Sequence, residues 1–424
     1  MAFNKFRVLF SLLLINLTIF SVLAQTNEIN AVRDVSSSLN QFALHLLSAT
    51  TDQCGDKLNL AISPYTVWSL MTIIAEGARG NTARQLEDVL KIPSNENKDL
   101  FRHNYKSLTK YLLQRADSVQ LDISSAIFTT QEQELNRTYQ AITKSYYGVD
   151  VMPTNFNNLV QAVDSINSYV SRATHNRIQK FVKIDDIIDA QIFMVATLFF
   201  KGQWKAPFNE TFEDTFIDEF GNAKGPVKMM YQIGPFPYSI IPNLKAHAIE
   251  LPYGKGDRMS MIVILPRKGE PLSSFLKQLA ELPFSTVLDT LESAAEEYGE
   301  EDVQVYLPKF TITSDLNMNS VLDQMGIKDV FNAETADLLG IFPHYLYVSR
   351  VIQQAKIEVN EEGTVATAAA GASISYKSPP PKFYANRNFV YFIVDKVTKS
   401  IIFAGKVTNP NTICDFCAKK ANSK

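Results

Sequence analysis

The sequence predicts an α+β fold, in which helices pack on large β-sheets, rather than a strict alternation of strands and helices. Two observations support this fold class. In the first half of the chain, apolar residues recur three and four positions apart, which is the period of an amphipathic helix. In the second half the period changes, and short apolar or alternating runs lie between Gly, Pro and Asn residues, as strands do.

Four segments are predicted to be helical. In the first, the apolar side chains share one face: Val32, Val35, Leu39, Phe42, Ala43 and Leu46. The second begins at Ser63-Pro64 and ends near Gly77, because a serine hydroxyl caps a first turn and proline lacks an N–H that this turn does not need. A third helix is predicted over residues 100–114, and a later one over residues 316–325.

Four segments of the second half are predicted to be strands. Each is a short apolar or alternating run: Met261–Leu265, Val303–Phe310, Phe389–Val394 and Ile401–Ala404. Runs of this kind are buried on one or both faces of a sheet.

The N-terminus has the composition of a secretory signal peptide. Two basic residues precede an apolar run over residues 8–23, and Ala24 is a small residue at the predicted cleavage site. The run is near or below the roughly 20 apolar residues that a membrane span requires, and Asn16 interrupts it. We therefore predict that residues 1–24 are removed and that the mature protein is secreted, extracellular and without a membrane span.

Residues 25–424 are predicted to form a single domain that ends in a short polar tail, residues 411–424. The full chain is 46% apolar and 20% charged, which is ordinary globular composition, and no Pro/Gly/Ser-rich or charged linker divides it. A formal net charge of −3 gives no reason to expect a nucleic acid as partner.

No metal or redox site is predicted. Cys54 stands alone, while Cys414 and Cys417 lie in the polar tail without the strand–helix unit or the further ligands that redox and zinc sites require. The five histidines are scattered without ligand spacing. The leftover thiol could pair between chains in an oxidising compartment, and the pairing of the three cysteines stays open. Sequons at Asn136 and Asn209 are predicted glycosylation sites on the surface.

The most unusual segment covers residues 361–378. Between Gly363 and Tyr376 it contains no charged residue and almost no large side chain. A disordered linker or an alanine-rich helix is also rich in small residues. A linker, however, gains nothing from excluding charge, and a helix gains nothing from losing its large apolar residues.

Both features are explained by a loop that becomes a strand inside a sheet. Alternate side chains would then enter the interior: Thr364, Ala366, Ala368, Ala370, Ala372 and Ile374. Small uncharged residues are buried at little cost, whereas an unpaired charge at an inward position would cost several kcal/mol.

The chain also carries, in order, motifs that resemble those of the serpin family. Glu361-Glu362-Gly363-Thr364 followed by an alanine-rich run is similar to the hinge of inhibitory serpins. Further motifs extend over almost the whole mature chain: Asn59–Pro64, Gly77–Thr82, Phe199–Trp204 with Phe208, Leu251–Tyr253, Ser260-Met261, Leu307–Phe310, Ala336-Asp337, and Phe403–Val407 with Asn409-Pro410. Any one motif is weak, but the ordered set is specific.

The resemblance implies a serpin fold, with helices packed around three β-sheets and an exposed reactive-centre loop, here about residues 361–382. It also implies a suicide-substrate mechanism. A target serine protease attacks the loop and forms an acyl-enzyme, the loop inserts as a new central strand, and the distorted protease stays bound as a covalent 1:1 complex. The protein is then expected to be a monomer before reaction. The implied hinge residues are Glu361, Gly363, Thr364, Ala366, Ala368, Ala369 and Ala370.

Counting from the hinge glutamate with the family's spacing places the reactive bond at Lys377-Ser378. Lysine fits the acidic pocket of trypsin-like proteases, and Pro379 would block cleavage one position further on. The alternatives are Lys382-Phe383, which would leave the loop too long, and Tyr376-Lys377, which would suit a chymotrypsin-like enzyme.

The resemblance also implies a region that controls the opening of the main sheet, formed by Ser63, Thr66, Ala196, Trp204, Lys309 and Gln353. Many serpins hold an Asn–His pair where this chain has Ala196 and Gln353. Because a buried polar group without a partner costs roughly 1–3 kcal/mol, our hypothesis is that Gln353 bonds instead to Ser63 or Thr66.

One further feature of the chain matches the family pattern and another departs from it. The family pairs the hinge glutamate with a lysine of the neighbouring strand, which predicts an ion pair between Glu361 and Lys309. Asn388 stands where the family usually has proline before Phe389, and little functional effect is expected from this difference.

Arg102, Lys106 and Lys110 form a stripe that resembles the helix with which some serpins bind heparin-like polyanions. Three basic residues on a solvated face are usually no more than that, so no cofactor is expected to be required.

An enzyme is not predicted, because the chain lacks a Gly-x-Ser-x-Gly elbow, a His-Glu-x-x-His motif and a glycine-rich phosphate loop. The alternative is a non-inhibitory serpin that acts as a carrier, storage protein or chaperone. Such relatives often have bulky, charged or proline residues in the hinge, whereas residues 363–372 here contain none. The chain also resembles arthropod serpins that restrain extracellular protease cascades in melanisation and innate immunity, and this pathway rests on analogy.

Overall fold

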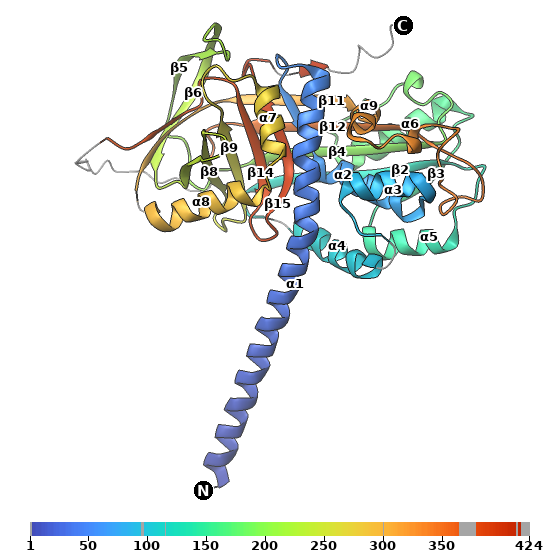
Figure 1. Ribbon diagram of the computed structural model, residues 1–424, viewed down its shortest axis with the longest axis horizontal. Coiled ribbons are helices and arrows are strands. Elements are labelled where there is room, and N and C mark those ends of the chain that lie inside the picture. Colours follow the sequence, from blue (N-terminus) through green and yellow to red (C-terminus); the bar gives the residue numbers. More distant parts are fainter. Residues whose placement is uncertain are drawn as a thin grey trace.

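The computed structural model describes residues 2–94, 97–114, 116–299, 301–363, 379–412 and 414–416. Side chains are described from residue 26 onward within these ranges, apart from Asn27 and residues 414–416. Helices and three β-sheets make up this part of the chain (Figure 1), which confirms the predicted α+β class.

The main sheet runs in the spatial order β16 (Cys414–Phe416), β11 (Phe310–Asn317), β12 (Val348–Val359), β4 (Ile192–Gly202), β2 (Val119–Thr130) and β3 (Asp150–Thr154). The second sheet runs in the order β1 (Leu60–Ile62), β15 (Ser400–Val407), β14 (Phe389–Asp395), β9 (Met259–Leu265), β8 (Ala246–Tyr253) and β7 (Tyr238–Ile241). The small sheet runs in the order β13 (Lys382–Tyr384), β10 (Val303–Pro308), β6 (Ala223–Gly234) and β5 (Glu210–Ile217).

The described α-helices are α1 (Ala2–Cys54), α2 (Pro64–Gly77), α3 (Gly80–Leu90), α4 (Lys98–Leu112), α5 (Arg137–Ile142), α6 (Leu159–Ala173), α7 (Leu272–Ala280), α8 (Ser285–Tyr298) and α9 (Asn319–Met325). Short turns of other helix types are η2 (Thr143–Tyr147), η3 (Ile184–Asp186) and η4 (Asp329–Phe331). The N-terminal part of α1 projects away from the body of the protein (Figure 1). Within the described residues, no helix is both long enough and apolar enough to cross a membrane.

Helix α2 begins and ends as its sequence predicts. The Ser63 side chain accepts a hydrogen bond from the Thr66 amide, and Pro64 occupies the first helical position. The helix ends at Gly77, where a Cβ atom would lie 2.2 Å from Ile341 Cγ1. A glycine is therefore required for this close approach.

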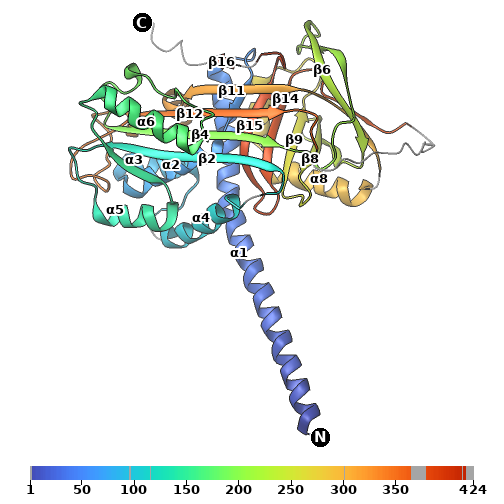
Figure 2. The same ribbon diagram turned by 180° about the vertical axis from the view of Figure 1, so that it is seen from behind.

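Helices cover both faces of the main sheet. Helix α2 belongs to the larger core, which contains residues from Val32 to Val407 and also includes the second sheet. Helix α6 crosses the opposite face (Figure 2) and packs there in a smaller core with the segment that follows it, through residues such as Ile166, Phe181 and Phe193. Strand β4 is buried along almost its whole length, in agreement with its apolar sequence, whereas β11 and β12 alternate between buried and partly exposed side chains.

The central strands β4 and β12 are parallel neighbours, paired from Ile192 with Val348 to Lys201 with Glu358. We call this parallel ladder the seam. Strand β2 is antiparallel to β4 on one side, and β11 is antiparallel to β12 on the other.

Two predicted elements, and the predicted helical content of the first half, differ from the structure. Residues 303–310, predicted as one strand, form β10 and the start of β11 in two different sheets, because the chain changes sheets at Lys309. The helix predicted over residues 316–325 begins only at Asn319, since Leu316 still belongs to β11. The first half is also less helical than predicted, because it contains β2, β3 and β4.

The end of α1 is covalently tied. Cys54 is disulfide-bonded. The side chains of the other two cysteines, Cys414 and Cys417, lie outside the described residues, so the pairing of the three cysteines stays open.

Candidate functional site

We call the end of the seam at Lys201 and Glu358 its upper end, and the end at Ile192 and Val348 its lower end. The start of the predicted hinge lies at the upper end. Beyond β12 the chain continues beside Trp204, whose backbone N–H donates to the Glu362 carbonyl at 3.0 Å and whose indole Nε1 donates to the Asn360 carbonyl at 2.7 Å. The Phe208 amide donates to the Glu361 carbonyl at 3.2 Å. Trp204 also stacks on Tyr253, with ring centroids 4.3 Å apart. A buried aromatic platform therefore fixes the backbone of the hinge.

Two ion pairs lie on the same segment. Lys309 Nζ is 2.5 Å from Glu361 Oε2, which confirms the predicted pair. Lys201 Nζ is 3.6 Å from Glu362 Oε2. The hydrogen bond from Lys309 lowers the pKa of the Glu361 carboxyl, so this carboxylate is ionised at neutral pH. Both pairs are partly exposed, and we expect them to fix the position of the hinge more than to stabilise the fold.

Gly363 is the last residue that the structure describes at the start of the predicted loop. It bridges to Trp204 in parallel fashion, and a Cβ atom at this position would lie 2.5 Å from Pro207 Cβ. A larger residue would therefore push the hinge away from the platform.

Gln353 lies beneath the middle of the seam, opposite Ala196 in the ladder, and both are fully buried. Its Oε1 accepts a hydrogen bond from the Ser63 amide at 3.2 Å. Its Nε2 donates to the Ser63 carbonyl at 2.7 Å and to Thr66 Oγ1 at 3.0 Å. The hypothesis that Gln353 bonds to Ser63 or Thr66 is confirmed with both partners, and the bonds tie β12 to the start of α2.

This arrangement is suited to the opening of the seam. The described residues contain no group of His, Cys, Asp and Glu side chains that could hold a metal ion. What the site offers is a parallel ladder, with Gly363 held beside Trp204 at its upper end. A strand that turned back from β12 into the seam would run antiparallel to both β12 and β4, replacing one parallel ladder with two antiparallel ladders.

The structure unites part of the predicted site. Ser63, Thr66, Ala196 and Gln353 lie together under the seam, and Trp204, Lys309, Glu361 and Gly363 lie together at its upper end. The hinge residues Thr364, Ala366, Ala368, Ala369 and Ala370 and the predicted reactive bond Lys377-Ser378 lie outside the described residues. Asn360, Lys201 and Pro207 also contact the hinge, and the sequence does not predict these contacts, because they depend on the register of the seam.

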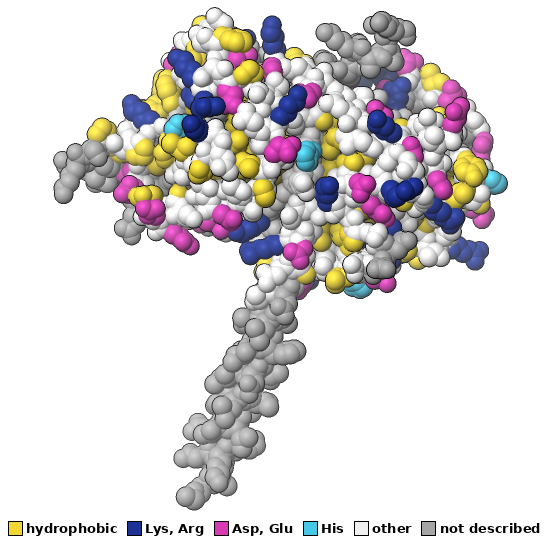
Figure 3. Space-filling model, viewed as in Figure 1, with side chains coloured by type: hydrophobic (Ala, Val, Ile, Leu, Met, Phe, Trp, Pro, Cys, Tyr) yellow, Lys and Arg dark blue, Asp and Glu magenta, His cyan; other side chains and the backbone are white. Residues whose placement is uncertain are grey.

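The prediction that the basic stripe on α4 is solvated is wrong for one of its three residues. Arg102 is only partly exposed and is paired: its Nη2 is 2.6 Å from Glu76 Oε2, and its Nη1 is 2.6 Å from Asp99 Oδ1. The hydroxyl of Tyr147 donates to Glu76 as well. On the face shown in Figure 3, basic and acidic side chains are interspersed.

Other predicted positions lie at the surface. Asn136 is exposed at the start of α5, and its side chain accepts hydrogen bonds from the Thr138 and Tyr139 amides. Asn209 is exposed just before β5. Asn388 is mostly buried and donates from Nδ2 to Glu219 Oε2 at 2.7 Å.

The seam, hinge and three sheets correspond to a known family. A family model described as serpin (serine protease inhibitor) matches residues 37–410. The chain belongs to the serpin family. A serine protease inhibitor from Cyanea capillata is 33% identical to this serpin over 370 residues, which cover 84% of the present chain and 93% of the relative. Human antithrombin-III is 32% identical over 393 residues, covering 89% of this chain and 82% of the relative.

Solved structures agree with the family assignment. The mouse protein-Z dependent protease inhibitor superimposes on this serpin with a TM-score of 0.77 and 26% identity, covering 91% of this chain and 99% of that one. Serpin-12 of Manduca sexta gives a TM-score of 0.77 at 24% identity, covering 90% and 99% of the two chains, and supports the fold. The predicted serpin fold is thus confirmed, and membership of this family supports protease inhibition as the general function.

Proposed function

We propose that this serpin inhibits a trypsin-like serine protease as a suicide substrate. The protease cleaves Lys377-Ser378, and its catalytic serine forms an ester with the Lys377 carbonyl while the chain beginning at Ser378 is released from that bond. Residues 364–377 then enter the seam, and the protease remains attached in a covalent 1:1 complex. The protein itself is a monomer before reaction and needs no cofactor.

The observation that carries this proposal is the geometry of the seam. Its two strands lie side by side with no strand between them, and the upper end of β12 leads directly into the hinge at Gly363. The residues that follow are small and uncharged up to Tyr376, so their entry between two buried strands costs little desolvation. The added antiparallel pairing supplies the driving force for trapping.

The target class follows from the residue at the cleaved bond. Lys377 has the side chain that the acidic specificity pocket of trypsin-like proteases binds. We propose further that residues 1–24 direct secretion and that Asn136 and Asn209, both exposed, are glycosylated. The physiological target would then be an extracellular protease of an immune, melanisation-type cascade.

The proposal is tested by mixing the purified mature protein with trypsin and looking for a covalent adduct that survives denaturing electrophoresis. We expect the adduct with the wild type and with Lys382→Ala, but not with Lys377→Ala, because only Lys377 is the proposed cleavage residue. Cleavage without any adduct in the wild type would contradict inhibition and favour the carrier, storage or chaperone function.

A second variant separates cleavage from insertion. Ala368→Arg places a charge at an inward position of the entering strand, where burial without a partner costs several kcal/mol. We expect this variant to be cleaved at Lys377 as fast as the wild type but to release active trypsin. Ala369→Arg, at the adjacent outward position, is the matched control and should still trap the protease.

A further inference from the structure

The lower end of the seam is joined by a second set of contacts. The Gln191 backbone N–H donates to Ser349 Oγ at 2.8 Å, and the Tyr347 N–H donates to Gln191 Oε1 at 3.3 Å. These bonds run from Gln191, the residue before β4, to Tyr347 and Ser349, on either side of Val348, whose pairing with Ile192 is the last of the ladder. Gln191 and Ser349 are both only partly buried.

Each side of this crossing is anchored to its own half of the main sheet. The Gln191 carbonyl accepts a hydrogen bond from Thr130 of β2 at 2.8 Å. On the other side, Asn319 of α9 donates from Nδ2 to the Ser349 carbonyl at 2.9 Å, and its Oδ1 accepts from the Val351 amide at 2.9 Å. Separation of β4 from β12 must therefore break the bonds of Gln191 to Ser349 and Tyr347, while the anchoring bonds can stay intact.

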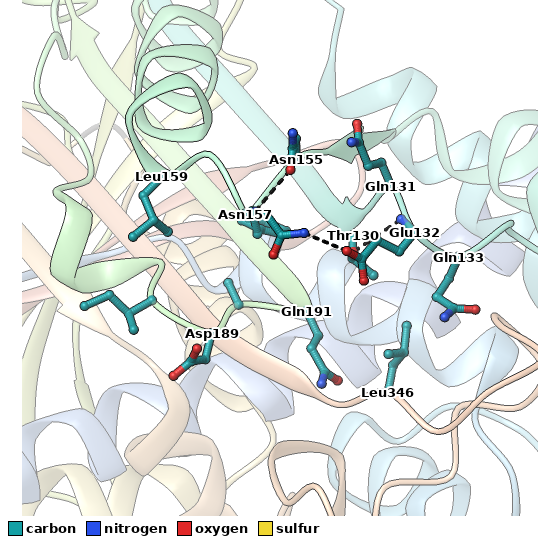
Figure 4. A pocket seen from close by; sticks show the side chains of 13 residues that line it. Thr130, Gln131, Glu132, Gln133, Asn155, Asn157, Leu159, Asp189, Gln191 and Leu346 are labelled. Atoms are coloured by element: carbon teal, nitrogen blue, oxygen red, sulfur yellow. Dashed lines mark hydrogen bonds between the residues drawn. The ribbon is translucent and has the colours of Figure 1, made fainter.

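A polar pocket of about 560 Å³ opens beside the crossing. Its walls come from the segments that follow β2 and β3 and from those that precede β4 and β12. Gln191 and Leu346 both line it. Figure 4 shows the Gln191 side chain exposed in this pocket, with Asp189 on one side and Leu346 on the other. The side chain has room to turn away from Tyr347 when the seam opens. An ion pair between Arg350 and Asp186, at 3.1 Å, lies on the same part of β12 but is partly exposed and holds the strands weakly.

The entering segment is long enough to extend to the crossing of Gln191 with Ser349 and Tyr347. Strand β12 has 12 residues and ends at Val359. If the chain turns over residues 360–363, residues 364–375 match β12 in antiparallel register. Tyr376 and Lys377 then lie opposite Tyr347 and Leu346. The last residues before the proposed cleavage site therefore need the lower crossing to be open.

We propose that Gln191 and Ser349 form a latch that controls the final step of loop insertion, after the upper seam has already accepted the hinge. Both act as positioning residues, because they touch neither the protease nor the cleaved bond. This inference rests on the proposed function. A latch that opens quickly favours trapping of the acyl-enzyme, and a latch that opens slowly gives the protease time to hydrolyse the ester and escape.

The test uses synthetic peptides of two lengths, which anneal into the intact protein without a protease. The short peptide has the sequence of residues 364–371 and ends above Ser349, while the long peptide has that of residues 364–377 and passes the latch. The rate of 1:1 complex formation is followed by native mass spectrometry for the wild type and for Ser349→Ala. Ser349→Thr, which keeps the hydroxyl, is the matched control, and Gln191→Ala removes the acceptor of the Tyr347 amide as a second variant.

We expect Ser349→Ala and Gln191→Ala to accelerate annealing of the long peptide by about fivefold, the factor for one hydrogen bond of about 1 kcal/mol, and to leave the rate of the short peptide within about twofold. Ser349→Thr should match the wild type. Equal acceleration of both peptides, or no acceleration of the long one, would overturn the latch alone. If neither peptide anneals to any variant, the seam does not accept a strand, and the proposed function fails together with the latch.

Discussion

Replacement of Gln353 by alanine is expected to loosen the main sheet at its centre. The substitution removes three hydrogen bonds at a fully buried position, two to the Ser63 backbone and one to Thr66 Oγ1. The Ser63 carbonyl still accepts a bond from the Thr66 hydroxyl at 3.0 Å, but the Ser63 N–H loses its partner. A buried donor without a partner costs about 1–3 kcal/mol. With the lost packing, we expect destabilisation by about 2–4 kcal/mol.

The assay is guanidinium-induced unfolding followed by intrinsic fluorescence, combined with native electrophoresis after mild heating. We expect an earlier first unfolding transition and faster polymer formation, because β12 is no longer held to α2 and the seam separates more readily. The matched control is Gln354→Ala, at the next position of β12, where side chains point to the opposite face of the sheet. Gln354 Oε1 is buried without a hydrogen-bond partner, so this control should lose less than about 1 kcal/mol. A Gln353→Ala protein with the stability and polymerisation rate of the control would refute the reasoning.

Three further predictions concern charged groups. Glu361→Lys places a second positive charge beside Lys309 and should produce polymers on mild heating, visible by native electrophoresis; a variant that remains monomeric would count against a role for the pair. Burial raises the pKa of Asp315 to about 6. Since this pKa lies above the ordinary value near 4, the folded state loses stability as pH rises from 4 to 6. Asp315→Asn should therefore stabilise the protein by up to about 3 kcal/mol at pH 7 and by almost nothing at pH 4 in denaturant titrations, and equal effects at both pH values would contradict the assignment. On a heparin column we expect elution at or below physiological salt, because Arg102 is paired with Glu76; retention well above that salt concentration would reverse this expectation.

Much of the site could be predicted because its residue types can take few structural roles at these positions. Ser63 and Pro64 define a helix start from local chemistry alone, and the helix begins there. A glutamine in place of an expected buried partner has to find a new hydrogen bond, and Gln353 does so with the predicted residues. The ion pair of Glu361 with Lys309 was likewise predictable from the family pattern.

Other features depend on tertiary structure. The apolar run over residues 303–310 gives no local sign that the chain changes sheets at Lys309, where the backbone N–H donates to the Lys228 carbonyl. Arg102 looks like one of three basic residues on a helical face until its partner Glu76, on another helix, is placed beside it. The crossing of Gln191 and Ser349 joins positions far apart in sequence, and only the register of the seam reveals it.

The central claim is that the seam accepts the loop as a strand once the loop is cut. The most direct test is to cleave the purified protein at Lys377 and to compare the thermal unfolding midpoints of the cut and intact forms by scanning calorimetry. Insertion replaces the parallel ladder with two antiparallel ladders, so we predict a large rise in the midpoint of the cut form. A midpoint that stays the same or falls after cleavage would contradict insertion, and with it the proposed mechanism of inhibition.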